Sequence, residues 1–544
     1  MNELSRIFAD IRDGETVILE KNKVYDVRCE DSFYKSGYYC SNTAKKHENP
    51  DGSRYAAIFM KDKKNIVIDG NDATILVHGK MTPLLFDNCE NVTVRNLAVD
   101  YACPTMSEFT VVSDDGESAV IRINPECLFT VDGNELIWHG EENPDGGYYW
   151  EDSAHGNRRH VKLYDPETRQ TEDFSRDDMV FDSIEIIDEY TLRLYPKNKN
   201  AGFREGCVYQ TRNIVRDQTG SLFQRCTDLT FENMRIMFMH GLGIVSQFCE
   251  NVTFRNCDLT PKEGRTVAST ADFFQFSGCK GQLTVENCKA WGAHDDYINV
   301  HGTHLRIVEI NENENSLTVR FMHPETWGMQ AFEKGDRIEY IRWDTLISYG
   351  ETVVEGFERL DDTDIKLFVS VIPERIVVGR DVVENATWTP DLHVSGCDFG
   401  PTSGRGILCT TRGRVIIENN SFINLWGPAL LLEDDCNFWF ESGYTKEIVF
   451  RKNYVSGCDF HKTWDTAPVI RCTPKVMKED SQKFVHGKLI ISGNAFEKSA
   501  CGTHSIWLEY LAEAEITDNV FDADYKINAK CVGKITDKNN KICK

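Results

Sequence analysis

The chain has 544 residues, of which 41% are hydrophobic and 27% charged, a composition typical of a soluble globular protein. This length exceeds what one ordinary core requires, so we expect several domains or one elongated architecture. The net charge of −25 argues against partners such as nucleic acid or an anionic membrane, because both would approach a negative field. The sequence contains no apolar run of roughly 18 residues, the length that predicts a transmembrane helix.

Residues 1–100 are predicted to form an N-terminal cap and the first coils of a solenoid. The first 30 residues suit a short helix and strand that cover an open sheet edge. They lack the basic and apolar regions of a secretory signal, so we expect a cytoplasmic protein. The segments NIVIDGNDA (65–73) and NVTVRNLAV (91–99) follow, and their alternation and β-branched content favour strands over helices.

Two stretches break this rhythm. Residues 101–220 combine polar, aromatic loops with strands such as SIEIIDEYTLRLYP (183–196), and residues 303–390 alternate like an antiparallel set. We predict that both are insertions, each a small β-barrel or sandwich. Residues 221–302 and 391–544 return to short repeating strands and are predicted to be further coils.

The repeating strands end in asparagines at a recurring interval. The intervals are 23 and 31, then 41 and 25 residues, in the triplets Asn233, Asn256, Asn287 and Asn453, Asn494, Asn519. A period in the twenties with occasional stretching is typical of stacked coils. Asn tolerates left-handed backbone angles, and its amide can bond to the next coil. We therefore predict an all-β fold, a right-handed parallel β-helix with inserted antiparallel β-barrel or sandwich domains.

Nineteen cysteines recur in this pattern, several of them just after an Asn or a Gly. They show neither CxxC pairs nor the spacing of a small disulfide framework. We predict reduced thiols that stack as a ladder inside the solenoid rather than disulfides or metal ligands.

Three carboxylates fall about one coil apart. Asp272 precedes the adjacent pair Asp295 and Asp296 by 23 and 24 residues. Equivalent positions of neighbouring coils stack at roughly 4.8 Å, so we expect these side chains to meet on one face. Crowding raises the pKa of at least one carboxyl, and a protonated carboxyl beside an ionised one suits acid/base cleavage of a glycosidic bond. A separation of one coil fits both inverting and retaining geometry.

Two other interpretations of the Asp pair stay open. Adjacent Asp residues are commonly a solvated turn, and clustered oxygens also form Ca²⁺ sites. His294 and His301 are poor Ca²⁺ ligands, whereas His301 and Asn299 suit hydrogen bonds to a sugar or to a carboxylate. We therefore expect neither a metal nor another cofactor.

Four segments carry a family resemblance that covers most of the chain. They are residues 41–104, EGRTVASTADFFQFSGCKGQLTVENC (263–288), DDYINVHG (295–302), and GRGILCTTRGRVIIENNSF (404–422) with GPALLLEDDCNFWFESG (427–443). In these segments the sequence resembles glycoside hydrolase family 110, a family of exo-acting α-galactosidases that remove terminal α-1,3-linked galactose with inversion. The implied partner is a galactose-containing oligosaccharide; whether the chain forms a homodimer is left open.

The resemblance implies that Asp272, Asp295 and Asp296 are the catalytic cluster. Asp272 is the candidate general acid, and the general base is expected among Asp295 and Asp296. The resemblance further implies roles in binding the sugar or supporting the carboxylates for Asn299, His301, Arg405, Glu433, Asp434, Trp439 and Glu441. Arg405 would donate to sugar hydroxyls, and Trp439 would offer an apolar platform to the C–H face of a sugar.

The chain departs from the family pattern beside the carboxylates, at Phe273, Phe274, Gln275 and Tyr297. The family has smaller residues and a His after the first Asp, and an Ala after the Asp pair. The bulkier residues predict a narrower pocket or an altered leaving-group site. Two alternatives remain: another β-helical enzyme, either a different glycosidase or a polysaccharide lyase, and a non-catalytic carbohydrate-binding protein. A lyase would need a cation or a Lys or Arg base beside an acidic sugar.

Overall fold

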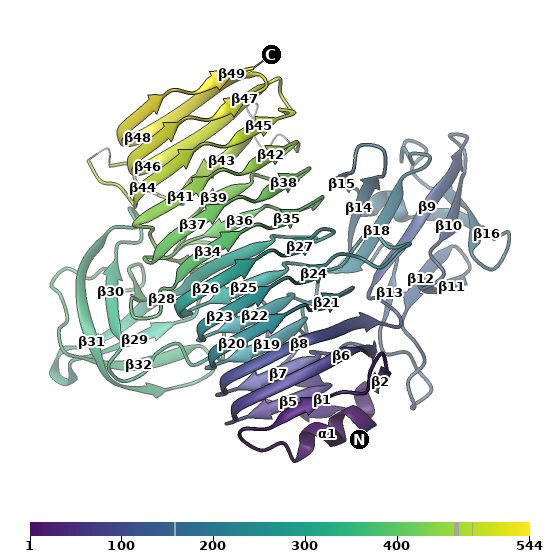
Figure 1. Ribbon diagram of the computed structural model, residues 1–544, viewed down its shortest axis with the longest axis horizontal. Helices are drawn as coiled ribbons and strands as arrows, with labels where there is room; N and C mark the ends of the chain where they lie inside the picture. The colour runs from purple at the N-terminus through teal and green to yellow at the C-terminus, as the bar shows by residue number, and fades with distance from the viewer. Residues whose placement is uncertain (157–158, 462–466, 481, 544) are drawn as a thin grey trace.

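The computed structural model describes residues 1–156, 159–461, 467–480 and 482–543. It is an elongated stack of parallel strands with two antiparallel units at its sides (Figure 1). The predicted fold class, an all-β parallel β-helix with inserted antiparallel domains, is confirmed. Within the described ranges, no helix has both the length and the apolar composition needed to cross a membrane.

Three parallel ladders run along the stack. The first consists of β5 (Ile58–Lys61), β7 (Leu84–Asp87), β19 (Ser221–Gln224), β22 (Ile244–Gln247), β25 (Phe274–Ser277), β28 (Ile298–Asn311), β36 (Ile407–Cys409), β39 (Leu430–Leu432), β43 (Pro468–Cys472) and β46 (Thr503–Thr517). The second consists of β1 (Thr16–Ile18), β6 (Lys64–His78), β8 (Glu90–Tyr101), β20 (Thr227–Glu232), β23 (Glu250–Arg255), β26 (Lys280–Glu286), β34 (Asp391–Ser395), β37 (Arg414–Glu418), β41 (Glu447–Arg451), β44 (His486–Ser492), β46 and β48 (Asp524–Lys538).

The third ladder consists of shorter strands that stack on either side of the C-terminal halves of the long strands β6 and β8. Its members are β2 (Val24–Arg28), β21 (Arg235–Ile236), β24 (Asp258–Leu259), β27 (Lys289–Ala290), β35 (Asp398–Phe399), β38 (Ser421–Ile423), β42 (Tyr454–Ser456), β45 (Ala495–Glu497), β47 (Val520–Phe521) and β49 (Lys541–Ile542). The helix α1 (Glu3–Ala9) lies at the N-terminal end of the stack (Figure 1), where Leu4 and Phe8 are buried. The 3₁₀ helices are η1 (Cys29–Asp31), η2 (Arg176–Met179) and η3 (Glu312–Glu314).

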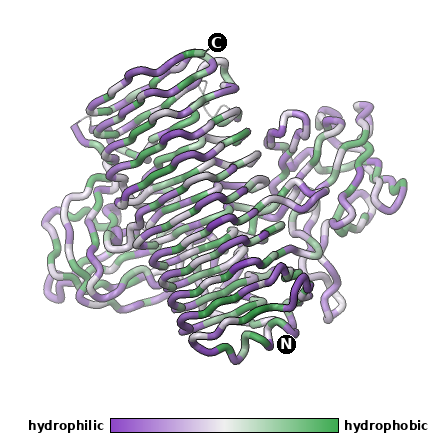
Figure 2. The backbone as a smooth tube through the Cα atoms, in the orientation of Figure 1, coloured by the Kyte–Doolittle hydropathy of each residue, from purple (hydrophilic) through white to green (hydrophobic). Residues whose placement is uncertain are grey.

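The interior of the stack is apolar because alternate side chains of each strand point inward. Hydrophobic and hydrophilic residues alternate along the coils (Figure 2). The inward residues form one continuous core from Leu4 to Phe521. All nineteen cysteines are free thiols. The predicted cysteine ladder forms for part of them, in two columns inside the solenoid. One column contains Cys257, Cys288 and Cys397.

The two asparagine triplets serve different purposes. Asn233, Asn256 and Asn287 adopt left-handed backbone angles with φ of 52–53°, which Asn tolerates in a turn. The other triplet continues the cysteine column as a ladder of buried amides. In it, Nδ2 of Asn453 donates to Oδ1 of Asn494 at 3.2 Å, and Nδ2 of Asn494 donates to Oδ1 of Asn519 at 2.9 Å.

The first antiparallel unit lies between β8 and β19. Its seven-stranded sheet runs in the order β15 (Gln170–Phe174), β14 (Arg159–Asp165), β18 (Val208–Asn213), β9 (Met106–Asp114), β10 (Ala119–Ile123), β17 (Thr191–Pro196) and β16 (Phe181–Ile186). A three-stranded sheet accompanies it, with β11 (Leu128–Asp132), β12 (Glu135–His139) and β13 (Glu151–Ser153). The unit has its own apolar core around Trp138 and Tyr209.

The second antiparallel unit is a closed barrel. It is built from the end of β28 with β29 (Ser316–Arg320), β32 (Asp364–Val369), β31 (Ser348–Arg359), β30 (Arg337–Ile341) and β33 (Val382–Asn385). Each strand pairs with two neighbours, and β33 pairs back with β28, so the barrel leaves no unpaired edge. Two smaller pairings, β3 (Phe33–Lys35) with β4 (Arg54–Ala56) and β40 (Glu441–Ser442) with β28, lie beside the first ladder.

Candidate active site

Register between three coils builds the candidate site. Strand β28 pairs with β25 on one side and with β36 on the other. Each of the three strands has a charged residue two positions before its first paired residue. These residues are Asp272 before β25, Asp296 before β28 and Arg405 before β36. The same bend of three successive coils therefore presents two carboxylates and a guanidinium side by side.

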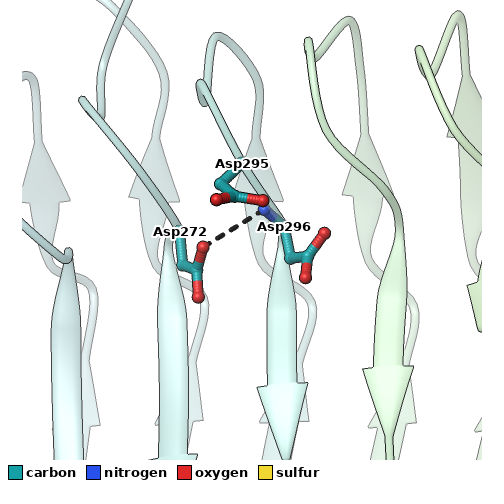
Figure 3. A group of neighbouring side chains, drawn as sticks. All are labelled: Asp272, Asp295 and Asp296. Carbon is teal, nitrogen blue, oxygen red and sulfur yellow. Dashed lines mark hydrogen bonds between the residues drawn. The ribbon is translucent and has the colours of Figure 1, made fainter. Parts of the chain in front are cut away.

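Asp295 completes a cluster of three carboxylates (Figure 3). One oxygen from each of Asp272, Asp295 and Asp296 lies within 4.8 Å of the other two. The backbone N–H of Asp296 donates to Oδ1 of Asp272 at 3.3 Å, which ties the two coils together at this point.

Two arginines compensate the charge of the cluster. Arg405 donates from Nε to Oδ1 of Asp296 at 2.6 Å and from Nη2 to Oδ2 at 2.7 Å, a bidentate pair. The same guanidinium lies 3.5 Å from Asp295, and Arg216 donates to Asp295 at 3.1 Å. Asp272 has no ion pair with any residue that the structure describes.

These surroundings separate the pKa values of the three carboxyls. Burial, followed by the negative charges of Asp295 and Asp296, raises the pKa of Asp272 well above its usual range. Burial also raises the pKa of Asp296 to about 7, while Arg405 opposes the rise and Asp295 adds to it. For Asp295, burial acts in the same direction, but Arg405 and Arg216 outweigh it and lower the pKa. The pKa shifts therefore favour the protonated form at Asp272 and the ionised form at Asp295.

The cluster lines a polar pocket of about 560 Å³, including space open to solvent. Most of the residues that line it carry charged or polar side chains, which can form hydrogen bonds with sugar hydroxyls. Eight of the ten site residues named from the sequence line it, all except His301 and Asp434. Among the eight, Glu433 is paired with Lys475 at 3.0 Å, and Trp439 is 45% exposed at the rim.

His301 and Asp434 are buried behind the lining. The Nδ1 of His301 lies 2.7 Å from the carbonyl oxygen of Gly302, and its Nε2 lies 3.9 Å from Oε1 of Glu441. Asp434 is paired with His304 at 3.0 Å. The sugar-binding role that the resemblance implies for these two residues stays a prediction.

Three charged or polar residues of the lining are not among those named from the sequence: Asn42, Arg216 and Asp435. Arg216 lies 79 residues before its partner Asp295, where the chain returns from the first insertion. Asn42 lies 399 residues before its partner Glu441. Asp435 accepts hydrogen bonds from the backbone of residues 437–440 and thereby holds the loop that carries Trp439.

The expectation that the bulky departures narrow the pocket is wrong for three of the four residues. Phe273, Phe274 and Tyr297 are at most 1% exposed and belong to the solenoid core. The rings of Phe273 and Tyr297 stack at 5.6 Å, and the Tyr297 hydroxyl donates to a backbone carbonyl. Only the fourth departure, Gln275, lines the pocket, because strand alternation turns it outward.

The same three carboxylates are the only described group whose oxygens could converge on a metal ion. Ca²⁺ typically takes six to eight oxygen ligands. Here Arg405 and Arg216 already neutralise Asp296 and Asp295 at direct contact distance. The donor set therefore suits an ion-paired carboxylate cluster better than a cation site.

Known proteins resemble this chain over most of its length. An α-1,3-galactosidase A of Akkermansia muciniphila is 34% identical over 89% of this chain and 78% of that protein. An α-1,3-galactosidase A of Bacteroides thetaiotaomicron is 30% identical over 85% and 79%. Residues 316–383 match the family model described as GLAA-B beta-barrel domain II. A family 28 exopolygalacturonase of Yersinia enterocolitica has 10% identity and a TM-score of 0.38, and the match covers 99% of this chain and 74% of that structure.

The parallel β-helix, its polar pocket and the two related α-1,3-galactosidases define a β-helical glycoside hydrolase. More narrowly, the chain belongs to glycoside hydrolase family 110, the family of the α-1,3-galactosidases to which it is 30–34% identical.

Proposed function

We propose that this protein releases terminal α-1,3-linked galactose from oligosaccharides by acid/base hydrolysis with inversion and without a metal. The observation that carries the proposal is the pair of opposed carboxyls in one polar pocket: the pKa of Asp272 is raised, and the pKa of Asp295 is lowered. Such a pair supplies a proton donor and a proton acceptor at the same pH. The names of the relatives supply the sugar and the linkage.

In this proposal Asp272 donates its proton to the glycosidic oxygen, and Asp295 accepts a proton from the attacking water. Asp296 stays paired with Arg405, and this ion pair holds the two side chains beside the substrate. Asp295 suits the base because its side chain is 31% exposed and can contact water, whereas Asp296 is buried. Glu441, Asn299 and the rim residue Trp439 would hold the terminal sugar.

Retention is the second candidate outcome, because the oxygens of the cluster lie within 4.8 Å of one another. Inverting enzymes typically hold the two carboxyls ~6.5–9.5 Å apart and retaining ones ~5–5.5 Å. The distance between nearest oxygens is a lower bound on that separation. Inversion is the outcome that the family resemblance implies, and the first-formed anomer distinguishes the two.

The test is to incubate the protein with α- and β-linked galactosides and galactobioses and to follow the released sugar by NMR. We expect β-galactose as the first anomer from α-1,3-galactobiose, with and without a chelator. First release of α-galactose would establish retention. Release from no member of the panel, or activity lost on chelation, would contradict the proposal and favour another β-helical carbohydrate-active enzyme.

Variants separate the two roles. Asp272→Asn is expected to lower kcat on galactobiose by about 10²–10⁴-fold, but much less on p-nitrophenyl α-galactoside, whose leaving group needs little protonation. Asp295→Asn should be slow on both substrates. Asp398→Asn, a change at an exposed residue of β35, is the matched control and should behave like the wild type. Equal losses for Asp272→Asn on the two substrates would exclude Asp272 as the acid.

We also propose that the protein works in a reducing compartment such as the cytoplasm. Its nineteen free thiols, most of them buried, are compatible with such a compartment. Fractionation of the source cells with detection of the protein tests this proposal, and recovery outside the cell would contradict it.

A further inference from the structure

One loop of the barrel insertion, residues 321–328 between β29 and β30, clamps a distant segment of the pocket wall. The carbonyl oxygen of Glu325 accepts a hydrogen bond from the backbone N–H of Thr43 at 3.2 Å. The indole N–H of Trp327 donates to the carbonyl oxygen of Ala44 at 3.0 Å. The loop therefore holds the chain on one side of the pocket residue Asn42.

Thr326 of this loop fixes the side-chain amide of Asn42. The backbone N–H of Asn42 donates to Oγ1 of Thr326 at 3.2 Å, and the threonine hydroxyl donates to Oδ1 of Asn42 at 2.9 Å. Both residues are less than 5% exposed, so bulk water does not compete for these bonds. Because the hydroxyl proton occupies Oδ1, the amide can present only its Nδ2 to the pocket.

Asn42 in turn holds two charged residues of the pocket. Its Nδ2 donates to Oε1 of Glu441 at 2.5 Å, and its carbonyl oxygen accepts from Nη1 of Arg216 at 3.2 Å. Asn299 donates to the same Oε1 at 3.4 Å. The second oxygen of Glu441 has no hydrogen-bond partner within the described part of the chain, although the side chain lines the pocket.

We propose that Thr326 is a positioning residue: through Asn42 it holds Glu441 so that Oε2 accepts a hydroxyl of the bound sugar. The barrel insertion is then a working part of the pocket, although it contributes none of the three catalytic carboxylates. The identity of the sugar rests on the proposed function, whereas the positioning concerns this chain alone.

The kinetic test replaces Thr326 by Val, which keeps the shape and removes the hydroxyl. Loss of one hydrogen-bonded constraint on a binding group should raise KM for p-nitrophenyl α-galactoside about 3- to 10-fold with kcat within about twofold. Thr326→Ser retains the hydroxyl and should restore the KM. Thr318→Val, a buried change on β29 of the same barrel, is the matched control and should leave KM unchanged. Wild-type KM for Thr326→Val would overturn the proposal.

A double-mutant cycle shows whether Thr326 acts through Asn42. In an Asn42→Ala background, Thr326→Val should have no further effect on KM, because the amide that it orients is gone. Independent, multiplying effects would overturn the proposal.

A crystal structure of Thr326→Val gives an answer that does not depend on activity. The amide of Asn42 should rotate away from Oε1 of Glu441, and an unchanged contact would overturn the proposal. If the wild type releases no galactose, the proposed function fails, while this structure still decides the positioning.

Discussion

Replacing Arg405 by Met should destabilise the protein in a pH-dependent way. Met keeps much of the length of the side chain but removes the bidentate pair with Asp296. Removing one partner of a buried ion pair costs about 3–5 kcal/mol. Because the Arg405 side chain is 29% exposed, we expect the lower end of this range, about 3 kcal/mol at a pH where Asp296 is ionised in both proteins.

The pH dependence arises because the orphaned Asp296 can take up a proton. Burial raises its pKa to about 7 even beside Arg405, and loss of the guanidinium raises it further. In the unfolded chain an Asp titrates near ~3.9, so the folded state binds the proton more tightly. The free energy of unfolding therefore falls as pH rises from the unfolded to the folded pKa. The deficit of the variant relative to the wild type should be small near pH 5, grow above the wild-type pKa of about 7, and be complete only above the higher pKa of the variant.

The assay is urea unfolding of Arg405→Met and wild type across this pH range. Arg414→Met is the control, since Arg414 is exposed on β37 and lies 3.7 Å from Glu447. Its effect should stay within about 0.5 kcal/mol at every pH. An equal deficit for Arg405→Met at pH 5 and pH 8 would refute the charge argument and point to lost packing instead.

Three further predictions concern residues around the pocket. Tyr297→Ala should lower the free energy of unfolding by about 3–5 kcal/mol, measured by urea unfolding, because it leaves a cavity in the core. The KM of the folded enzyme should stay unchanged, and a changed KM would show that Tyr297 contributes to the pocket. Trp439→Ala should raise KM for a galactobiose about 2- to 10-fold with little change in stability, and an unchanged KM would exclude it as a platform. Gln275→His should alter the ratio of kcat/KM between galactosides, whereas Phe274→Leu, a core control, should not.

The fold was accessible from sequence because it is repetitive. Strand alternation, a period in the twenties and recurring asparagines each reflect one coil, and one coil is a local unit of structure. The two asparagine triplets nevertheless look alike in sequence. They differ because Asn233 itself takes the left-handed turn position, whereas Asn453 lies just after Lys452, the residue with positive φ.

Only the part of the site that lies within the repeat could be predicted from the sequence. Asp272 and Asp296 are separated by one coil, so the period predicts that they meet. Arg216 and Asn42 reach the pocket from outside the repeat, and no local pattern gives the path of such segments. The prediction that Phe274 narrows the pocket could have been avoided from the sequence. Neighbouring residues of a strand point to opposite faces, so if Gln275 of β25 faces the pocket, Phe274 must point into the core.

The amide ladder bears on how such a chain can change in length. Each Asn of the ladder bonds to the equivalent Asn one coil onward, from Asn420 to Asn540. Removing a whole coil leaves two compatible faces that can rejoin, whereas removing part of a coil leaves buried amides without partners, at a cost of ~1–3 kcal/mol each. Viable length changes in this part of the solenoid should therefore come in steps of one complete turn, or as loops that leave the ladder untouched.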